Sequence, residues 1–361
     1  MSQLNVDTIK KADGTGSLTV PAETGTVVTT ASPSLGRRNL IINGAMQVAQ
    51  RGTQVTGVTT DGYKTCDRFV VGASSLGTWT VDQSTDSPDG FSNSFKMTAT
   101  TADASPASGD YALLGSYLEA QDLQHLGYGT SNAKTMTLSF WVKSNKTGDA
   151  SLNILQDDNS NKLFSNSYTI NTADTWEYKT IAIPADTAGV INNDNGRGLS
   201  LTWWLNSGST FSGGSYATTW SSYVNDNRNV SNLAVGGATS DYFAITGVQL
   251  EVGSVASSYE HRSFGEELAL CQRYFATNDG GGTGVAWFFS PEQLGSGFGR
   301  TTIFYPVEMR ANPTISNLTY ANSSYSTSGA QNSLNRLCFT AWLNGMTNNN
   351  ELFSWTADAE L

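Results

Sequence analysis

The 361-residue sequence contains only two histidines, His125 and His261, so a Ser-His-Asp or Cys-His catalytic set would have to use one of them. His261 stands just before a predicted helix, where a capping or hydrogen-bonding role is expected, and His125 falls at a predicted sheet edge. The sequence has no GxSxG nucleophile elbow, no P-loop and no GxGxxG leading from a strand into a helix. These patterns predict neither nucleophilic catalysis nor nucleotide binding.

Paired carboxylates are the other candidates for chemistry, because two of them about 5–10 Å apart can cleave a glycosidic bond. Asp157, Asp158, Asp194 and Asp226 fall in predicted loops. Nothing in the sequence brings two of them together, and loop aspartates usually form turns. We therefore predict that the protein is not an enzyme, with glycan cleavage kept as the last of three hypotheses.

Aromatic side chains are abundant, with 9 Trp, 14 Tyr and 15 Phe, and most are expected in the core. Flat rings that reach solvent could stack on sugar faces. The candidates lie in or beside the polar stretch 206–232, and Trp204 is placed on the polar-facing side of its strand. They are Trp204, Tyr216, Trp220 and Tyr223.

Composition indicates an all-β protein. Only 14% of the residues are charged, against about 25% in ordinary chains, and turn formers such as the 36 glycines replace them. The net charge of −11 argues against nucleic acid or an anionic membrane as partner. No apolar run approaches the ~20 residues that cross a bilayer, and the N-terminus lacks the apolar region of a secretory signal. Cysteines at 66, 271 and 338 are too few and too widely spaced for a disulfide framework or zinc site, so no cofactor or metal is expected.

Period-two alternation predicts antiparallel strands separated by turn residues. Residues 39–43 read as a buried opening strand, followed by strands near 79–81, 95–99, 136–143, 176–184 and 199–205. In the last of this series Phe243, Ile245, Val248 and Leu250 alternate with polar residues, and the phase slips at Gly247, which predicts a β-bulge. These strands favour an antiparallel sandwich over residues 37–262.

A helix should follow over residues 263–276. Ser263 is a suitable N-cap and Glu266 completes a capping box. The apolar face of this linking helix is expected to pack between domains or along a trimer axis. It comprises Phe264, Leu268, Cys271 and Phe275.

The two ends of the chain read as smaller β units. Residues 1–36 offer regular apolar positions in three short strands, too few to bury a core alone, so we expect a segment that anchors the chain to another protein. Its candidate assembly residues are Leu4, Val6, Ile9, Leu18 and Val20. Residues 277–361 carry strand candidates at 285–289, 301–307, 314–320, 337–343 and 352–355, which predict a C-terminal β domain.

Several motifs, in this order, resemble a family of tailed-phage tail-fibre and virion structural proteins of marine and cyanobacterial phages. They are RNLIING with QRG (38–44, 50–52), CDRF (66–69), MTLSFWVK (136–143), GVQLEVG (247–253), EELALCQRYF (266–275) and EMRANPT (308–314). The resemblance covers about residues 37–320. It implies a carbohydrate-binding-module-like jelly roll, one linking helix, a smaller C-terminal β-sandwich and a homotrimer in the virion.

The resemblance also implies a function, attachment to a host-surface glycan or receptor without catalysis, with residues 1–36 docked on another virion protein. The alternatives are a purely structural virion protein, such as a head fibre, capsid decoration or tail connector component, and a glycan-cleaving tailspike. Modules of this shape often hold a structural Ca²⁺ on acidic residues, but here those positions are Ala45-Met46 and Ile245-Thr246, which supply no carboxylate. The metal is therefore not expected.

Overall fold

The computed structural model describes residues 9–10, 17–18, 37–158, 161–278, 287–289, 292–295, 298–320, 326–327, 335–344 and 351–361. The chain divides into two compact units, Met1–Ser34 and Leu35–Leu361. In the first unit, β1 (Ile9–Lys10) pairs antiparallel with β2 (Ser17–Leu18), and Ile9 lies opposite Leu18. The predicted assembly residues Leu4, Val6 and Val20 lie outside the described residues.

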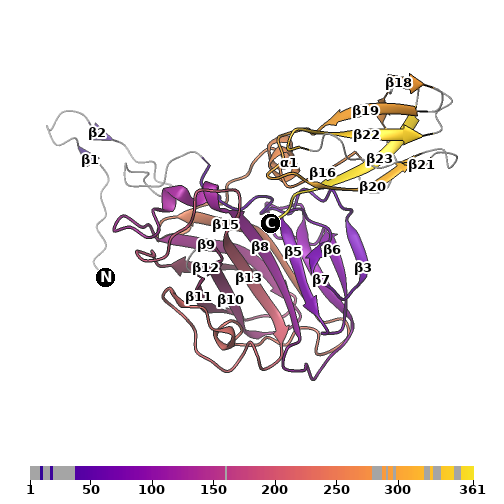
Figure 1. Ribbon diagram of the computed structural model, residues 1–361. Helices are drawn as coiled ribbons and strands as arrows, with labels where there is room; N and C mark the ends of the chain where they lie inside the picture. Colours follow the sequence, from indigo (N-terminus) through magenta and orange to yellow (C-terminus); the bar gives the residue numbers. More distant parts are fainter. Residues whose placement is uncertain are drawn as a thin grey trace. The chain divides into compact units, whose positions relative to one another are not determined.

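The second unit begins with two antiparallel sheets (Figure 1). The seven-stranded sheet has the order β14 (Ser221–Ser222), β11 (Lys162–Ile170), β10 (Gly148–Gln156), β13 (Arg197–Ser207), β8 (Tyr111–Glu119), β5 (Phe69–Ser74) and β4 (Gly62–Tyr63). The six-stranded sheet has the order β12 (Glu177–Ile183), β9 (Met136–Ser144), β15 (Tyr242–Val252), β7 (Ser94–Thr101), β6 (Thr78–Ser84) and β3 (Gln54–Val58). Two 3₁₀ helices, η1 (Ala120–Leu126) and η2 (Asn225–Asn227), lie in the connections.

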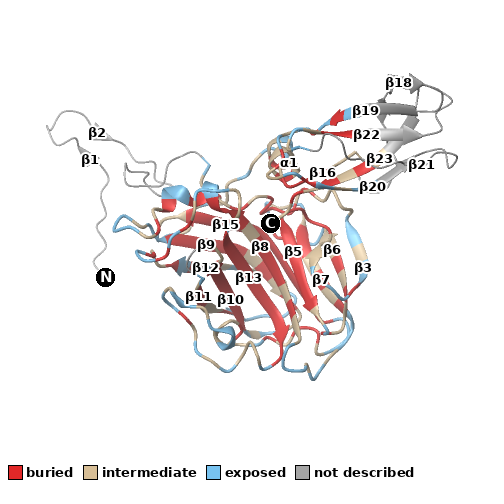
Figure 2. Cartoon of the chain, in the orientation of Figure 1, coloured by how far each residue is buried: buried red, intermediate tan, exposed pale blue. Residues whose placement is uncertain are grey.

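The inner faces of the two sheets share one apolar core, which makes this part a jelly-roll sandwich. Phe140 of β9 meets Trp203 of β13 with ring centroids 5.7 Å apart, and Phe69 of β5 meets Phe95 of β7 at 6.4 Å. Figure 2 shows buried residues along β8, β13 and β10. The predicted all-β sandwich is confirmed.

The predicted bulge in the closing strand is present. The register of β15 against β9 shifts between Thr246 and Gln249, and Gly247 within this shift has φ +60°. A Cβ at Gly247 would lie 2.6 Å from the Phe91 ring and 3.0 Å from the Trp141 ring. Glycine is therefore required here both by the backbone and by the two rings that cover it.

The predicted opening strand at residues 39–43 is wrong, because this segment forms a turn. The Asn39 side chain accepts hydrogen bonds from the Ile41 and Leu250 amides, at 2.9 and 3.1 Å. Asn43 has φ +61°, and its side chain accepts a hydrogen bond from the Val48 amide at 2.9 Å. Side-chain hydrogen bonds of both asparagines hold this turn, within the segment for Asn43 and also to Leu250 of β15 for Asn39.

The linking helix α1 (Phe264–Gln272) starts where predicted, and it is the one α-helix among the described residues. The Ser263 hydroxyl accepts a hydrogen bond from the Glu266 amide at 3.3 Å. The second half of the capping box is not formed, because the Glu266 carboxylate instead pairs with Arg37 at 2.6 Å. The helix ends before the predicted 276, and Phe275 begins strand β16 (Phe275–Thr277).

The predicted apolar face of this helix is only partly buried. Cys271 and Phe275 are buried in the single chain, and Leu268 is half-buried. Phe264 is 58% exposed, so the prediction that it packs between the β domains is wrong for this chain. It occupies the first helical position, at the helix end that faces solvent. Its packing along a trimer axis stays a prediction.

The C-terminal residues form a second, smaller sandwich. One sheet contains β16, β17 (Trp287–Phe289), β20 (Thr314–Tyr320) and β23 (Glu351–Asp358). The other contains β18 (Glu292–Gly295), β19 (Phe298–Phe304), β21 (Ser326–Thr327) and β22 (Cys338–Asn344). Phe339 and Tyr305 from one side contact Trp355 of β23 at 5.5 and 6.0 Å between ring centroids. The predicted C-terminal β-sandwich is confirmed.

Buried charges connect this sandwich to the jelly roll. Arg68 is 2% exposed, forms an ion pair with Glu360, and lies with its guanidinium carbon 3.5 Å from the centroid of the Tyr274 ring. Arg51 lies over the Phe275 ring at 3.6 Å and contacts Glu360 at 3.4 Å. Glu360, one of the last described residues, therefore binds two arginines that belong to the jelly roll.

Candidate functional site

A groove with a volume of about 250 Å³ crosses the outer face of the seven-stranded sheet. Alternation explains its lining, because every second residue of a strand points away from the core. On β8, Ala112 and Leu114 are buried in the core, while Tyr111, Leu113 and Tyr117 line the groove. Gly72 of β5 also lines the groove, and a Cβ there would come within 2.6 Å of Leu113. The sheet therefore forms an apolar base that is open to a ligand.

Aromatic rings stand along this base. Tyr117 is half-buried and meets Tyr63 edge-on, with ring centroids 6.5 Å apart. Tyr111 meets Phe211 edge-on at 5.7 Å, and its hydroxyl donates a hydrogen bond to Asp61 at 2.9 Å. Burial, together with Asp61, raises the pKa of Tyr111 to about 12, so this hydroxyl stays protonated and remains a donor.

An ion pair lies at the same face. Arg197 contacts Asp157 at 3.2 Å, and its guanidinium carbon lies 4.5 Å from the centroid of the Tyr117 ring. The Ser200 hydroxyl donates a hydrogen bond to Asp157. Burial raises the pKa of Asp157, while Ser200 and Arg197 oppose this rise. The groove thus combines ring faces with hydrogen-bonding and charged groups.

The second arginine of the groove, Arg228, is held by rings. Its guanidinium carbon lies 4.8 Å from the centroid of Trp204 and 5.6 Å from those of Phe211 and Tyr223. Its Nη1 donates a hydrogen bond to the Tyr223 hydroxyl at 3.0 Å. Contacts of a guanidinium with several rings fix its position without a carboxylate.

Of the four predicted ligand-contacting aromatics, the structure places Trp204 in the lining of this groove and Tyr223 beside its Arg228. Trp204 points outward as expected, but it is 1% exposed, so the expectation that its ring meets solvent is wrong. Phe211 and Arg228 cover it, and its Nε1 donates a hydrogen bond to Asn153 at 2.5 Å. Trp204 therefore forms part of the groove wall. Tyr223 is half-buried beside Arg228.

The other two predicted aromatics lie elsewhere. Trp220 packs against the sandwich core, with Tyr128 and Phe164 as ring neighbours, and its Nε1 donates to the Pro184 carbonyl at 2.8 Å. The Tyr216 hydroxyl accepts a hydrogen bond from the Ser231 amide at 3.0 Å. Both side chains have structural partners, and neither lines the groove. A role in binding stays a prediction for all four aromatics.

Sequence reasoning missed Tyr111, Tyr117, Arg197 and Arg228. One signal was available, since residues 111–118 carry large apolar or aromatic side chains at both odd and even positions. A strand with one solvated face would show polar residues at every second position. The pattern thus indicates that the outer face of β8 is covered or binds something.

The loop aspartates considered for hydrolysis mostly have structural roles. Asp158 accepts hydrogen bonds from the backbone and side chain of Asn192, and Asp194 accepts one from the Gly196 amide at 2.7 Å. Of the four, only Asp157 lines the groove. The histidines lie apart from it: His125 is in η1, and His261 contacts the rings of Tyr259 and Phe91.

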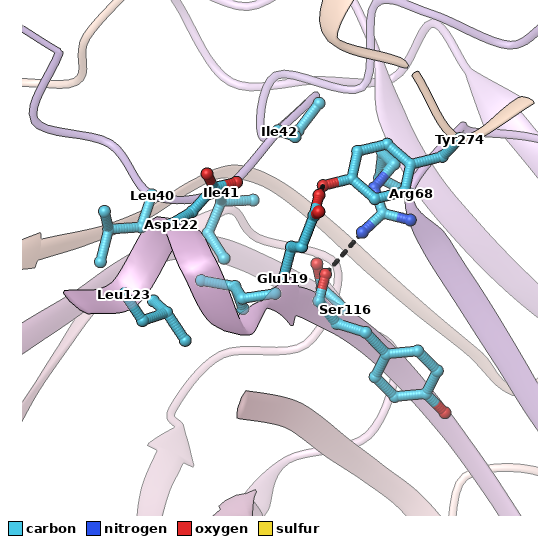
Figure 3. A pocket seen from close by; sticks show the side chains of 11 residues that line it. Leu40, Ile41, Ile42, Arg68, Ser116, Glu119, Asp122, Leu123 and Tyr274 are labelled. Atoms are coloured by element: carbon cyan, nitrogen blue, oxygen red, sulfur yellow. Dashed lines mark hydrogen bonds between the residues drawn. The ribbon is translucent and has the colours of Figure 1, made fainter. Parts of the chain in front are cut away.

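A second cavity lies where the jelly roll meets Tyr274 (Figure 3). The Tyr274 hydroxyl donates to Glu119 at 2.7 Å, and Arg68 donates to the Tyr117 carbonyl at 2.6 Å. Arg273 also pairs with Glu119 at 2.6 Å. The cavity has a volume of about 20 Å³, which is room for about one water molecule. This cavity belongs to the junction and is too small for an organic ligand.

The positions of the structural calcium in similar modules do not fit a metal here. Ile245 is fully buried in the apolar core, and the Thr246 hydroxyl donates a hydrogen bond to the Asn93 carbonyl at 2.7 Å. Within the described part of the chain, no three His, Cys, Asp or Glu side chains gather closely enough to hold an ion.

No described helix has the length and apolarity to cross a bilayer.

No protein-family model matches the sequence, and neither does any curated protein. Solved structures similar to this chain include the enzymatically active domain of tailspike protein 4 of bacteriophage CBA120, at 14% identity and a TM-score of 0.30. This match covers 60% of this chain and only 21% of the tailspike.

Two further similar structures are a putative sugar-binding protein from Bacteroides thetaiotaomicron and a family 11 carbohydrate-binding module from Clostridium thermocellum. The first has 14% identity and a TM-score of 0.35, covering 60% of this chain and 100% of that protein. The second, in complex with a β-1,3-1,4-mixed-linked tetrasaccharide, has 11% identity and a TM-score of 0.28, covering 57% of this chain and 99% of the module.

Proposed function

We propose that this chain is a non-enzymatic fibre protein of a phage virion that binds a glycan on the host surface. The groove on the seven-stranded sheet carries this proposal. Its half-buried Tyr117 ring and apolar base suit the C–H faces of sugar rings, and Ser200, Asp157 and Arg197 suit their hydroxyl groups. The groove has a volume of about 250 Å³, so it can contact a few atoms of the sugar rings closely while the rest of the glycan stays outside it.

The placement in the virion rests on the sequence motifs between residues 38 and 314, which occur in the order seen in tail-fibre and structural proteins of tailed phages. The short pairing of β1 with β2 supports an attachment role for the N-terminal unit, because two-residue strands cannot bury a core of their own. In this proposal that unit binds another virion protein.

Replacing Tyr117 with alanine should weaken glycan binding about tenfold, equivalent to ~1.4 kcal/mol, because a stacking face is removed from the groove. Glycan-array screening followed by calorimetry on the best oligosaccharide measures this. Tyr178→Ala is the matched control, since Tyr178 is 44% exposed on β12 of the other sheet and should leave affinity unchanged.

Equal affinity for the wild type and Tyr117→Ala would rule out this groove as the binding site. Release of shorter oligosaccharides during incubation would instead favour the glycan-cleaving alternative. A wild-type protein that binds no glycan, together with density at the capsid in a particle reconstruction, would favour a purely structural virion protein.

We also propose that the fibre is a homotrimer, in which the exposed Phe264 side chain on α1 would pack along the trimer axis. Light scattering should then report three times the chain mass of 38.5 kDa. A mass of one chain at micromolar concentration would exclude a stable trimer.

A further inference from the structure

Arg228 forms no ion pair in the described part of the chain, although its charge favours the ionised form of Asp157 in the same groove. Among the described residues that line the groove, the one ion pair joins Arg197 to Asp157. Among the described residues, the Arg228 guanidinium makes one hydrogen bond, from Nη1 to the Tyr223 hydroxyl, and its Nε is buried without a partner. A buried donor that lacks an acceptor is destabilising, so this one needs an explanation.

The two carboxylates of the groove are already engaged. Asp157 binds Arg197 and the Ser200 hydroxyl. Asp61 accepts hydrogen bonds from the Tyr111 hydroxyl at 2.9 Å and from the Ala73 amide at 2.8 Å. An additional anion would therefore meet Arg228 outside any ion pair, and it would meet two carboxylates whose charge is already partly offset by their own donors.

The position of Arg228 is preorganised. Rings of Trp204, Phe211 and Tyr223 surround the guanidinium, and its own backbone amide donates to the Asn225 carbonyl at 3.1 Å. A side chain fixed in this way loses little conformational freedom when it binds a ligand. A guanidinium also forms stronger hydrogen bonds to carboxylate or sulfate oxygens than to hydroxyl groups.

We infer that the groove selects acidic glycans, with Arg228 as the residue that binds the carboxylate or sulfate of the sugar while Tyr117 stacks on a ring. This inference rests on the proposed glycan-binding function and adds the charge of the ligand to it. It is notable because the whole chain carries a net charge of −11, which would otherwise repel an anionic polymer. A local cation within the groove is the feature that overcomes this repulsion.

The test compares oligosaccharides that differ only in charge. The probes are uronic-acid oligosaccharides, the same oligosaccharides as methyl esters, sulfated oligosaccharides, and neutral oligosaccharides, arrayed and then titrated against the full chain. We expect the wild type to bind an acidic probe at least about tenfold more tightly than its neutral counterpart. The uronate and sulfate arms show which acidic group is recognised.

Three variants assign the preference to the groove. Arg228→Gln should abolish the preference for the acidic probe, and Arg228→Lys should restore part of it. Asp157→Asn should tighten binding of the acidic probe several-fold, because it removes a negative charge close to the ligand and frees Arg197. This gain cannot arise from misfolding. Arg336→Gln, a partly exposed arginine of the C-terminal sandwich, is the control and should change nothing.

The outcomes separate this inference from the proposed function. Equal binding of acidic and neutral probes by the wild type, or an acidic preference that persists in Arg228→Gln, would overturn the inference and leave glycan binding in place. A wild type that binds none of the probes would overturn both. Loss of the preference in Arg228→Gln together with the gain in Asp157→Asn would establish it.

Discussion

Replacing Arg68 with methionine should lower the free energy of unfolding by about 3–5 kcal/mol, the usual cost of breaking a buried ion pair from one side. The Arg68 and Glu360 side chains are only 2% and 6% exposed, and the substitution leaves the Glu360 carboxylate with Arg51 alone, at 3.4 Å. It also removes the guanidinium that covers the Tyr274 ring and binds the Tyr117 carbonyl. Urea unfolding followed by tryptophan fluorescence measures the change.

Two comparisons show whether the cost comes from the unpaired charge. Arg37→Met breaks an exposed pair with Glu266 and should cost less than about 1 kcal/mol. The double variant Arg68→Met, Glu360→Met removes both charges and should be more stable than Arg68→Met alone. If Arg68→Met were no more costly than Arg37→Met, the junction would not depend on this pair.

Asp67 should make the protein less stable as the pH rises from about 4 to about 6. Its carboxylate is completely buried beside Gln50, and burial raises its pKa to about 6 against the opposing effect of the Arg51 guanidinium. An unfolded aspartate titrates near pH 3.9. Between these values the folded state holds the proton and the unfolded state does not, so stability decreases with rising pH. About two pKa units correspond to ~3 kcal/mol.

Other carboxylates titrate in the same range, so the contribution of Asp67 is the difference between the wild type and Asp67→Asn. Unfolding by urea should be measured for both at several pH values between 4 and 7. The stability of the wild type relative to Asp67→Asn should fall across pH 4 to 6 and then level off. A difference that stays constant, or grows with pH, would contradict the raised pKa.

Local sequence patterns predicted an element correctly where the contacts that determine the element join residues close together in the sequence. The phase slip at Gly247 predicted the bulge because side-chain alternation is a local property of a strand. Ser263 predicted the start of α1 because a cap acts within one turn of the helix. The strand predicted at 314–320 matches β20 for the same reason.

The errors and omissions involve partners that are distant in sequence. Residues 39–43 look like a strand, but Asn39 binds Leu250, which no local pattern could reveal. The capping box failed because Arg37 takes the Glu266 carboxylate. The groove depends on Arg197 and Tyr117 of the seven-stranded sheet meeting Arg228, which follows η2. This meeting is set by the order of the strands and the path of that connection, which the sequence does not display.

The pairing of β16 with β23 fixes where the chain enters and leaves the C-terminal sandwich. Phe275, just after the helix, lies opposite Asp358, so the chain enters and leaves the C-terminal sandwich at neighbouring positions. Arg51 and Arg68 of the jelly roll contact Glu360, which lies beyond β23, but the segment between the two strands also contacts the jelly roll. Arg310 in this segment donates a hydrogen bond to the Asn195 carbonyl at 2.6 Å, and the Asn195 side chain donates one to the Arg310 carbonyl at 2.7 Å. A different segment inserted between these two strands would therefore keep the junction intact only if it retained an arginine at the position of Arg310.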